Sequence, residues 1–295
     1  MQGGNLGAAI IPVLTGAGFS VSLLSRSEKN AQDLPPGVKS VVVDYGSRAS
    51  LEAAFRGKDV VIAALGMEAI GSQPAIIDAA ISAGVRRYIP SDFGSVSTDP
   101  RVASLGPYPL FVGIQNYLKE KAAQGVLEYT IFSTGGFTEF LVGDGILVDL
   151  KGHSVELWQD GQHRISSTTM AGIGKAIVGA LKEPEASKNR NLLVHEFVIT
   201  QAQILDLHRK HDPAGTEWTV TSIDDPRAEL TGREKTLAAE PNGANALAFI
   251  KATIMGGLFR AHYEKVDNEL VGLELRPEAD LEAILVEARN RPSPA

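Results

Sequence analysis

Apolar residues in the first half of the chain fall alternately into helix-spaced segments and short continuous runs. The run Val60–Leu65 is wholly apolar, as expected of a strand covered on both faces. Gly18, Gly57 and Gly84 stand where helices should end. The expected helices are residues 5–17, 50–55, 74–83 and 110–123, and the expected strands are residues 20–25, 38–43, 60–65, 87–90 and 129–133. This order predicts an α/β fold of the Rossmann type, a doubly wound parallel sheet with right-handed crossovers.

The regularity fades after about residue 135, where glycine and histidine interrupt the apolar runs. We expect strands within residues 146–165 and at residues 193–199. The expected helices in this part are residues 170–181, 202–211, 228–239, 243–263 and 278–290. The pattern therefore predicts a Rossmann domain over residues 1–150 and a smaller, mainly helical lobe over residues 151–295 that covers a ligand cleft.

Composition narrows the class of protein. The chain has 295 residues, of which 44% are hydrophobic and 21% charged, which is typical of a globular protein. The net charge of −7 argues against nucleic acid as a main partner. The absence of cysteine excludes disulfides, a catalytic thiol and thiolate metal sites. Because no apolar run is long enough to span a membrane and no signal peptide is evident, we expect a cytoplasmic protein without a membrane partner.

Glycines cluster at the start of the first expected helix, where a dinucleotide-binding turn would place them. Gly4 would let the backbone approach a pyrophosphate, Gly7 would let the helix pack closely on the sheet, and the helix N-terminus would favour the anion. The residues expected to contact the cofactor here are Gly4, Asn5, Leu6 and Gly7. Taken alone, two glycines three positions apart are better explained by a flexible N-terminal tail, and it is the sequence downstream that favours the turn.

An arginine follows the first expected strand, about twenty residues beyond the glycines. An acidic residue at this place would hold the ribose 2′-hydroxyl of NAD, whereas an arginine would accept the 2′-phosphate of NADP. Arg26, with Lys29 nearby, therefore favours NADPH. Glu28 is the competing acidic candidate, and a merely solvated Arg26 is the alternative.

Three stretches of the sequence, together with Arg26, resemble the NmrA-like and isoflavone-reductase-like branch of atypical short-chain dehydrogenases. They are the run GGNLG at residues 3–7, the segment 73–94 and the run STGGF at residues 133–137, and the most specific part is AGVRRYIPSDFG at residues 83–94. The resemblance covers essentially the whole chain. It implies a Rossmann domain, a C-terminal lobe that binds substrate, NADPH as cofactor, and reduction of a small, often aromatic or polyketide-like molecule of secondary metabolism. A redox sensor that binds a dinucleotide without turnover is the alternative, and an inactive product is a further one.

The N-terminus departs from the family pattern. Met1 stands where the family has its first glycine, so the strand that should precede the glycines is missing. That strand would lie between two others and bury about five apolar side chains, each contributing about 1.5–3 kcal/mol. We therefore expect that the natural chain starts upstream of Met1. Pro12 lies past the first turn of the expected helix and should kink it.

The residues expected to be catalytic depart from the family pattern as well. The resemblance implies a lysine between a phenylalanine and a tyrosine, but Phe111 and Tyr117 are only six positions apart and no lysine lies between them. Tyr117 and Lys121 instead match the tyrosine-x-x-x-lysine pattern of ordinary short-chain dehydrogenases, in which the lysine lowers the pKa of the tyrosine. Ser91, at the end of a strand, would polarise a substrate oxygen. Alternatively, Tyr117 is packing, and Lys119 and Lys121 are solvated helix charges.

Further candidates follow the ends of other expected strands. On the nicotinamide side we expect Gly66, Thr134 and Phe137, against the alternative of tight turns and core packing. Asp44 could contact adenine or cap a turn. No metal site is expected, because His208 and His211 are predicted to be a solvated helix end without a carboxylate partner. Aromatic and apolar candidates for the substrate lobe are Trp158, Phe249, Met255 and Phe259, although such residues are more often core. The oligomeric state is open, and a homodimer is possible.

Overall fold

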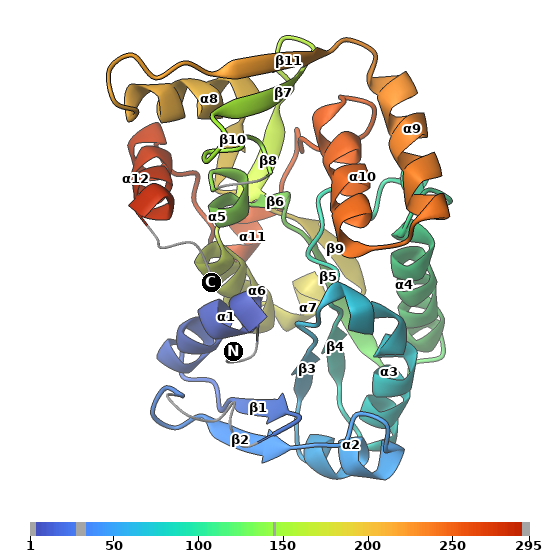
Figure 1. Cartoon of the computed structure of the whole chain (residues 1–295). Helices are drawn as coiled ribbons and strands as arrows, with labels where there is room; N and C mark the ends of the chain where they lie inside the picture. Colours follow the sequence, from blue (N-terminus) through green and yellow to red (C-terminus); the bar gives the residue numbers. More distant parts are fainter. Residues whose placement is uncertain (1–3, 28–33, 144–145, 291–295) are drawn as a thin grey trace.

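The computed structural model describes residues 4–27, 34–143 and 146–290. Two parallel sheets form its α/β layer, seen in the lower half of Figure 1. In the first sheet, β1 (Ser22–Ser25) pairs with β2 (Lys39–Val42). The second sheet has the order β3-β4-β5-β9, and its strands are β3 (Val60–Ile62), β4 (Arg87–Ile89), β5 (Glu128–Ser133) and β9 (Arg190–Leu193).

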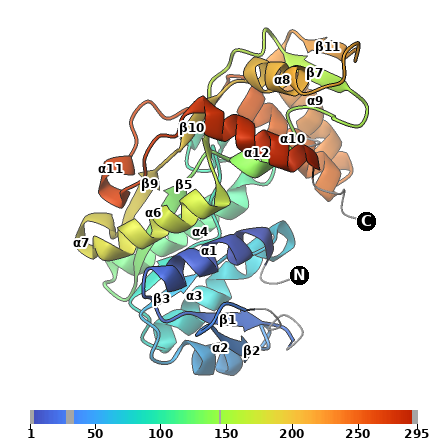
Figure 2. The ribbon, with the colours of Figure 1, turned by 90° about the vertical axis from the view of Figure 1, so that its left-hand side faces the viewer.

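Helices cover both faces of the larger sheet, because alternate residues of its strands point to opposite sides. Tyr88 and Ile131 pack against the helices of one face, which are α2 (Arg48–Phe55), α3 (Gln73–Ser82) and α4 (Tyr108–Ala123). Ile89 and Phe132 pack against the helices of the other face, which are α1 (Gly4–Gly16) and α6 (Met170–Lys182). Figure 2 shows α1 and α6 side by side. The predicted doubly wound arrangement is confirmed.

The two sheets are not joined by hydrogen bonds between β1 and β3, and within the described residues no strand lies between them. All three residues of β3 are half-buried, whereas all three residues of β4 are buried. As expected, the strand is packed on both faces, since Val61 lies against the cluster of one face and Val60 and Ile62 against that of the other, but its residues are less buried than those of β4. The physical reason is that β3 has a strand neighbour on only one side.

The backbone shows where the predicted helices begin and end. Gly18, Gly57 and Gly84 have φ values of 87°, 70° and 79°, as expected for glycines that end helices. The helix expected at residues 50–55 begins two residues earlier, at Arg48, because the side chain of Ser47 caps it by accepting a hydrogen bond from the backbone N–H of Ser50. Pro12 lies inside α1, as expected.

The rest of the chain forms the upper lobe in Figure 1. Its strands are β6 (Gly136–Phe137), β7 (Ser154–Trp158), β8 (Ile165–Thr168), β10 (Phe197–Ile199) and β11 (Thr219–Ile223). Its helices are α5 (Thr138–Leu141), α8 (Gln201–Lys210), α9 (Pro226–Ala239), α10 (Gly243–Met255) and α12 (Glu278–Asn290). The short helix α11 (Asn268–Val271) packs against α6 of the main layer. Three short helices lie elsewhere: η2 (Met67–Ser72), η3 (Pro100–Val102) and α7 (Pro184–Ser187).

The chain crosses between the α/β layer and the upper lobe more than once. The single strand expected at residues 193–199 is two strands, since β9 pairs with β5 of the main sheet and β10 pairs with β8 of the upper lobe. Both α6 and β9 follow residue 150, so the main layer extends past the predicted domain boundary. Likewise the helix expected at residues 243–263 ends at Met255, where α10 gives way to a loop. No helix among the described residues is long and apolar enough to cross a membrane.

Candidate cofactor and substrate site

The glycines at the start of the chain form the first turn of α1. Gly4, Asn5, Leu6 and Gly7 are helical, so the expected turn before the helix is part of the helix itself. This first turn contains no acidic residue. The N–H groups of a first helical turn have no acceptor within the helix and carry the positive end of its dipole. Figure 2 shows this end of α1 on the outer side of the ribbon. The arrangement suits an anionic group.

Hydrogen bonds join the carboxyl ends of the neighbouring strands β3, β4 and β5. Ser91, after β4, accepts from the backbone N–H of Leu65 at 3.0 Å and donates to its carbonyl oxygen at 3.2 Å. Thr134, after β5, donates to the carbonyl oxygen of Phe93 at 2.9 Å. Gly66 directly follows Leu65 and precedes η2. Ser91, Gly66 and Thr134 are thus brought to the same edge of the sheet.

Phe137 connects this edge to α1. Its half-buried ring and the side chain of Leu6 both pack against the hydrophobic cluster that contains Phe93. Leu6 and Phe137, 131 positions apart in the sequence, therefore pack against the same cluster. Parallel strands place ligand sites at their carboxyl ends, next to the N-termini of the crossover helices.

Arg26 follows β1 and is exposed. Its charge acts on Tyr45, whose hydroxyl donates to the carbonyl oxygen of Leu24 at 3.1 Å. Burial raises the pKa of Tyr45, and the nearby Arg26 guanidinium opposes this effect. Lys29 lies outside the described residues. Asp44 accepts a 2.9 Å hydrogen bond from the backbone of Gly46, which is the turn-capping role of the two expected for it.

Tyr117 and Lys121 lie on one face of α4, with the Lys121 ammonium 4.6 Å from the centre of the tyrosine ring. The Tyr117 hydroxyl, however, donates to Asp78 of α3 at 2.5 Å. This hydrogen bond and burial raise the pKa of Tyr117, and the opposing charge of Lys121 is too weak to reverse the shift. The expectation of a lowered tyrosine pKa is therefore wrong. In this structure the Ser91 hydroxyl is engaged by the Leu65 backbone and the Tyr117 hydroxyl by Asp78.

Gln115 is the side chain of α4 that reaches the loop after β4. Its amide nitrogen donates to Asp92 at 2.7 Å, and the Ser97 hydroxyl donates to the same carboxyl group at 2.5 Å. Asp92 is 2% exposed, and burial raises its pKa. Thus an amide, rather than a lysine, occupies the inner side of α4 at this point.

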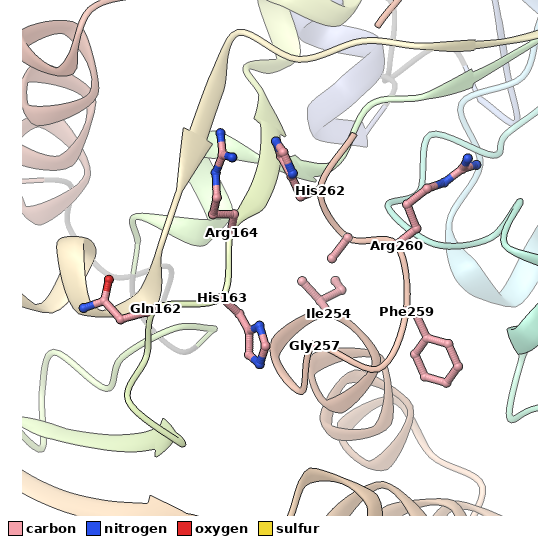
Figure 3. A pocket seen from close by; sticks show the side chains of 9 residues that line it. Gln162, His163, Arg164, Ile254, Gly257, Phe259, Arg260 and His262 are labelled. Atoms are coloured by element: carbon pink, nitrogen blue, oxygen red, sulfur yellow. The ribbon is translucent and has the colours of Figure 1, made fainter. Parts of the chain in front are cut away.

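A cavity of about 370 Å³ opens in the upper lobe, between the segment before β8 and the loop after α10. Figure 3 shows Arg164 next to His262, with Arg260 on the far side of the opening and its side chain pointing away from Arg164. The lining residues are Gln162, His163, Arg164, Ile254, Gly257, Phe259, Arg260, Ala261 and His262. Such a volume suits a small organic ligand.

Tyr263, the residue after His262, links this pocket to the sheet edge. Its hydroxyl accepts from the backbone N–H of Gly135 at 3.1 Å and donates to the carbonyl oxygen of Ser95 at 2.5 Å. Gly135 follows β5 directly, and Ser95 lies in the loop after β4. Because Tyr263 follows His262 directly in the chain, its side chain connects the loop that lines the pocket to the edge of the sheet at which the predicted cofactor residues gather.

A buried histidine stacks behind the pocket. The His195 and His262 rings are 6.2 Å apart and nearly parallel, and His195 is hydrogen-bonded to the Ser166 hydroxyl at 2.8 Å. Burial, with the charges of His262 and Arg164, lowers the pKa of His195 to about 4. Burial and Arg164 also lower the pKa of His262, against the effect of Glu264. Both rings are therefore biased toward the neutral form.

Sequence reasoning missed Arg164, Arg260 and His262 entirely. The two pocket segments are almost one hundred positions apart, and no motif spans them. Of the aromatic and apolar candidates for the substrate lobe, Phe259 lines the pocket, whereas Trp158, Phe249 and Met255 are buried core residues.

His208 and His211 differ from the solvated helix end expected for them. His208 is fully buried, and the ring of His211 lies 2.6 Å from the Glu282 carboxylate. Among the residues that the structure describes, no group of three or more histidine, aspartate or glutamate side chains could hold a metal ion.

Comparison with known proteins decides the family. The model of the NmrA-like family matches residues 2–227. The chain belongs to the NmrA-like family. This NmrA-like protein is 31% identical to the oxidoreductase aprR of Aspergillus flavus, over 93% of each chain. Its fold resembles that of isoflavone reductase (TM-score 0.67, 21% identity, 89% of this chain and 88% of that one). It also resembles leucoanthocyanidin reductase from Vitis vinifera, solved as a binary complex with NADPH (TM-score 0.73, 14% identity, 98% and 97%).

Proposed function

We propose that this NmrA-like protein is an NADPH-dependent reductase of a small, aromatic or polyketide-type molecule. The observation that carries the proposal is the N-terminus of α1, which is free of acidic side chains and whose Leu6 packs against the cluster that contains Phe93 of the loop after β4. Support comes from the relative named an oxidoreductase and from the leucoanthocyanidin reductase structure, whose title names NADPH.

The residues present fit the phosphates of NADPH. The first turn of α1, which includes Gly4 and Gly7, offers backbone N–H groups to a pyrophosphate. Gly7 is buried, and a Cβ added to it would meet no atom within 4 Å, so the expectation that this glycine lets the helix pack closely on the sheet is wrong. Arg26 is exposed and makes no ion pair with the described residues, so its guanidinium is available to a 2′-phosphate. On the nicotinamide side, Gly66, Thr134 and Phe137 border the same edge.

When bound, NADPH would supply a hydride to a carbonyl, enone or benzylic carbon. The chain would hold the substrate in the 370 Å³ pocket, where Phe259 and Ile254 provide apolar walls. Reduction also takes up a proton. The lining side chains that can carry a transferable proton are His163 and His262. Tyr263 fixes the pocket loop to the edge of the sheet through Gly135 and Ser95.

A redox sensor that binds NADPH without turnover is the second candidate. The observation that favours it is the engagement of both predicted catalytic hydroxyls, since Ser91 bonds to the Leu65 backbone and Tyr117 bonds to Asp78. Sensing requires the dinucleotide site but no proton donor.

One experiment separates these functions. The purified chain is titrated with NADPH by calorimetry, and NADPH oxidation is then followed with a panel of aromatic enones, aryl ketones and quinones. Binding with oxidation by at least one compound supports the reductase, and binding without any turnover favours the sensor. A folded protein that binds neither NADPH nor NADP⁺ overturns both.

A further inference from the structure

The loop that follows β4 contains a buried carboxyl group. Asp92 is 2% exposed, and no cation pairs with it in the parts of the chain that the structure describes. A buried carboxyl group costs free energy unless hydrogen bonds replace the water that it loses. The groups that donate to Asp92 therefore show which parts of the molecule it connects.

Two side chains supply these hydrogen bonds. The amide nitrogen of Gln115, on α4, donates to Asp92 at 2.7 Å and to the carbonyl oxygen of Ser97 at 3.2 Å. The Ser97 hydroxyl donates to the other carboxylate oxygen of Asp92 at 2.5 Å. All three side chains are buried. Together they form a cluster, the Asp92 cluster, which closes the loop on itself and attaches it to α4.

The part of the loop that the Asp92 cluster holds binds the end of β5. The carbonyl oxygens of Phe93 and Gly94 accept hydrogen bonds from Thr134, from its hydroxyl at 2.9 Å and from its backbone N–H at 3.3 Å. Ser91, at the start of the loop, is held separately, because its backbone N–H donates to the Gln73 side chain at 2.8 Å. The Asp92 cluster therefore acts on Thr134 rather than on Ser91.

The same part of the loop also holds the upper lobe. The Tyr263 hydroxyl donates to the carbonyl oxygen of Ser95 at 2.5 Å and accepts from the backbone N–H of Gly135 at 3.1 Å. Tyr263 directly follows His262, which lines the pocket. A shift of residues 93–97 would therefore move a predicted nicotinamide-side residue and the pocket loop together.

We propose that Asp92 and Gln115 are positioning residues of the reductase: through residues 93–97 they fix Thr134 and the loop of Tyr263, and so the place of the nicotinamide relative to the substrate. The inference rests on the proposed function and names positioning residues for it. Both side chains are buried and bonded to the protein, so they act through the loop and not on a ligand. Misplacing reacting groups by about 1 Å can slow a reaction by about a hundredfold.

Gln115→Met tests the Asp92 cluster, because methionine has nearly the same length but no donor. We expect its kcat for NADPH oxidation to fall by about tenfold to a hundredfold. Calorimetry should give an NADPH affinity within about threefold of the wild type, because the proposed phosphate site, at α1 and Arg26, lies outside the cluster. Gln124→Met changes an exposed glutamine at the end of the same helix and should behave like the wild type in both measurements.

Gln115→Glu gives a signature that a loss of stability alone would not produce. Two carboxyl groups in contact do not both ionise readily, so the pKa of one of them is raised. The proton held below that pKa restores a donor between positions 115 and 92, and this donor is lost as the pH rises. We expect the kcat of Gln115→Glu to approach the wild type in mild acid and to fall as the pH rises, whereas Gln115→Met stays low at every pH.

The fluorescence of bound NADPH reports on the nicotinamide without turnover. We expect the wild type to enhance this emission and Gln115→Met, at saturating NADPH, to lose about half of the enhancement or more, because the ring is less firmly held. If the wild type binds NADPH but oxidises it with no compound, the reductase fails, and the emission alone decides the inference.

A folded Gln115→Met whose kcat and NADPH emission equal those of the wild type overturns the inference. If urea denaturation shows that Gln115→Met is unfolded under the assay conditions, Gln115→Glu decides: a kcat that changes with pH as in the wild type overturns the inference, and an additional loss at high pH supports it.

Discussion

The Tyr117 hydroxyl lies 2.5 Å from the Asp78 carboxylate, in a hydrogen bond that connects α4 to α3. This bond stabilises the protonated phenol, since an ionised tyrosine would face a carboxylate at the same distance. Lys121, the residue expected to activate the tyrosine, lies over its ring and is bonded to Glu120. The pair therefore has the spacing of a catalytic motif and the environment of a structural contact.

Replacing Tyr117 by phenylalanine should leave turnover nearly intact. We expect NADPH oxidation by Tyr117→Phe to stay within about threefold of the wild type, with a loss of stability of about 0.5–1.5 kcal/mol for one hydrogen bond. Absorbance titration should also place the ionisation of Tyr117 above its ordinary pKa of 10.0, because Asp78 and burial raise it. A loss of activity of a hundredfold or more in a folded variant would restore the catalytic assignment.

Arg26 should decide between the two pyridine nucleotides. We expect Arg26→Gln to weaken NADPH binding by about tenfold to a hundredfold and to leave NADH binding within about twofold, because only NADPH carries the 2′-phosphate. Calorimetry with both nucleotides measures this difference. Arg56→Gln, which changes an exposed arginine at the end of α2, is the matched control. Equal losses for NADPH and NADH would contradict the role of Arg26.

Gly135 should tolerate no side chain. Its φ is 70°, and an added Cβ would lie 1.9 Å from the carbonyl oxygen of Ser166. We expect Gly135→Ala to cost about 3 kcal/mol or more, from backbone strain and forced displacement of β8. Gly125→Ala separates the two causes, because Gly125 has a φ of 71° but no atom within 4 Å of an added Cβ. That variant should lose only about 1–2 kcal/mol in urea denaturation, and equal losses would refute the steric argument.

Stability should fall in mild acid because of His208. This buried ring accepts a hydrogen bond from the Arg289 guanidinium at 3.1 Å, and burial, then Arg289, lowers its pKa from 6.5 to about 4. The unfolded chain therefore takes up a proton near pH 6.5 that the folded chain refuses until about pH 4. The contribution of His208 is complete above pH 6.5 and is lost as the pH falls through this window.

Urea denaturation at several pH values tests this dependence. Each proton bound only by the unfolded state gives a slope of about 1.4 kcal/mol per pH unit. We expect His208→Gln to lower the slope between pH 6.5 and pH 4 by about one such amount. His195→Gln should lower it similarly, since the pKa of His195 is also about 4. If the wild-type and His208→Gln curves are parallel, the ring is not the acid-sensitive group.

The periodicity of the chain by itself determined most of the helices of the main layer. The helices expected at residues 74–83 and 110–123 lie within two residues of α3 and α4, because apolar spacing and a terminal glycine are local signals. The order of helices and strands also determined the doubly wound sheet. The residues after the strands could be named as site candidates for the same reason, since the edge at which parallel strands end is fixed by topology.

Only the tertiary structure decided what these candidates do. Ser91 bonds to Leu65 and Tyr117 bonds to Asp78, partners 26 and 39 positions away that no spacing rule selects. The pocket of the upper lobe is equally non-local, because Arg164 and Arg260 line one cavity only when the loop after α10 folds back onto the start of β8. A sequence pattern reports which side a residue faces within its own element. The pKa of a group and its availability to a ligand depend on neighbours that long-range packing brings to it.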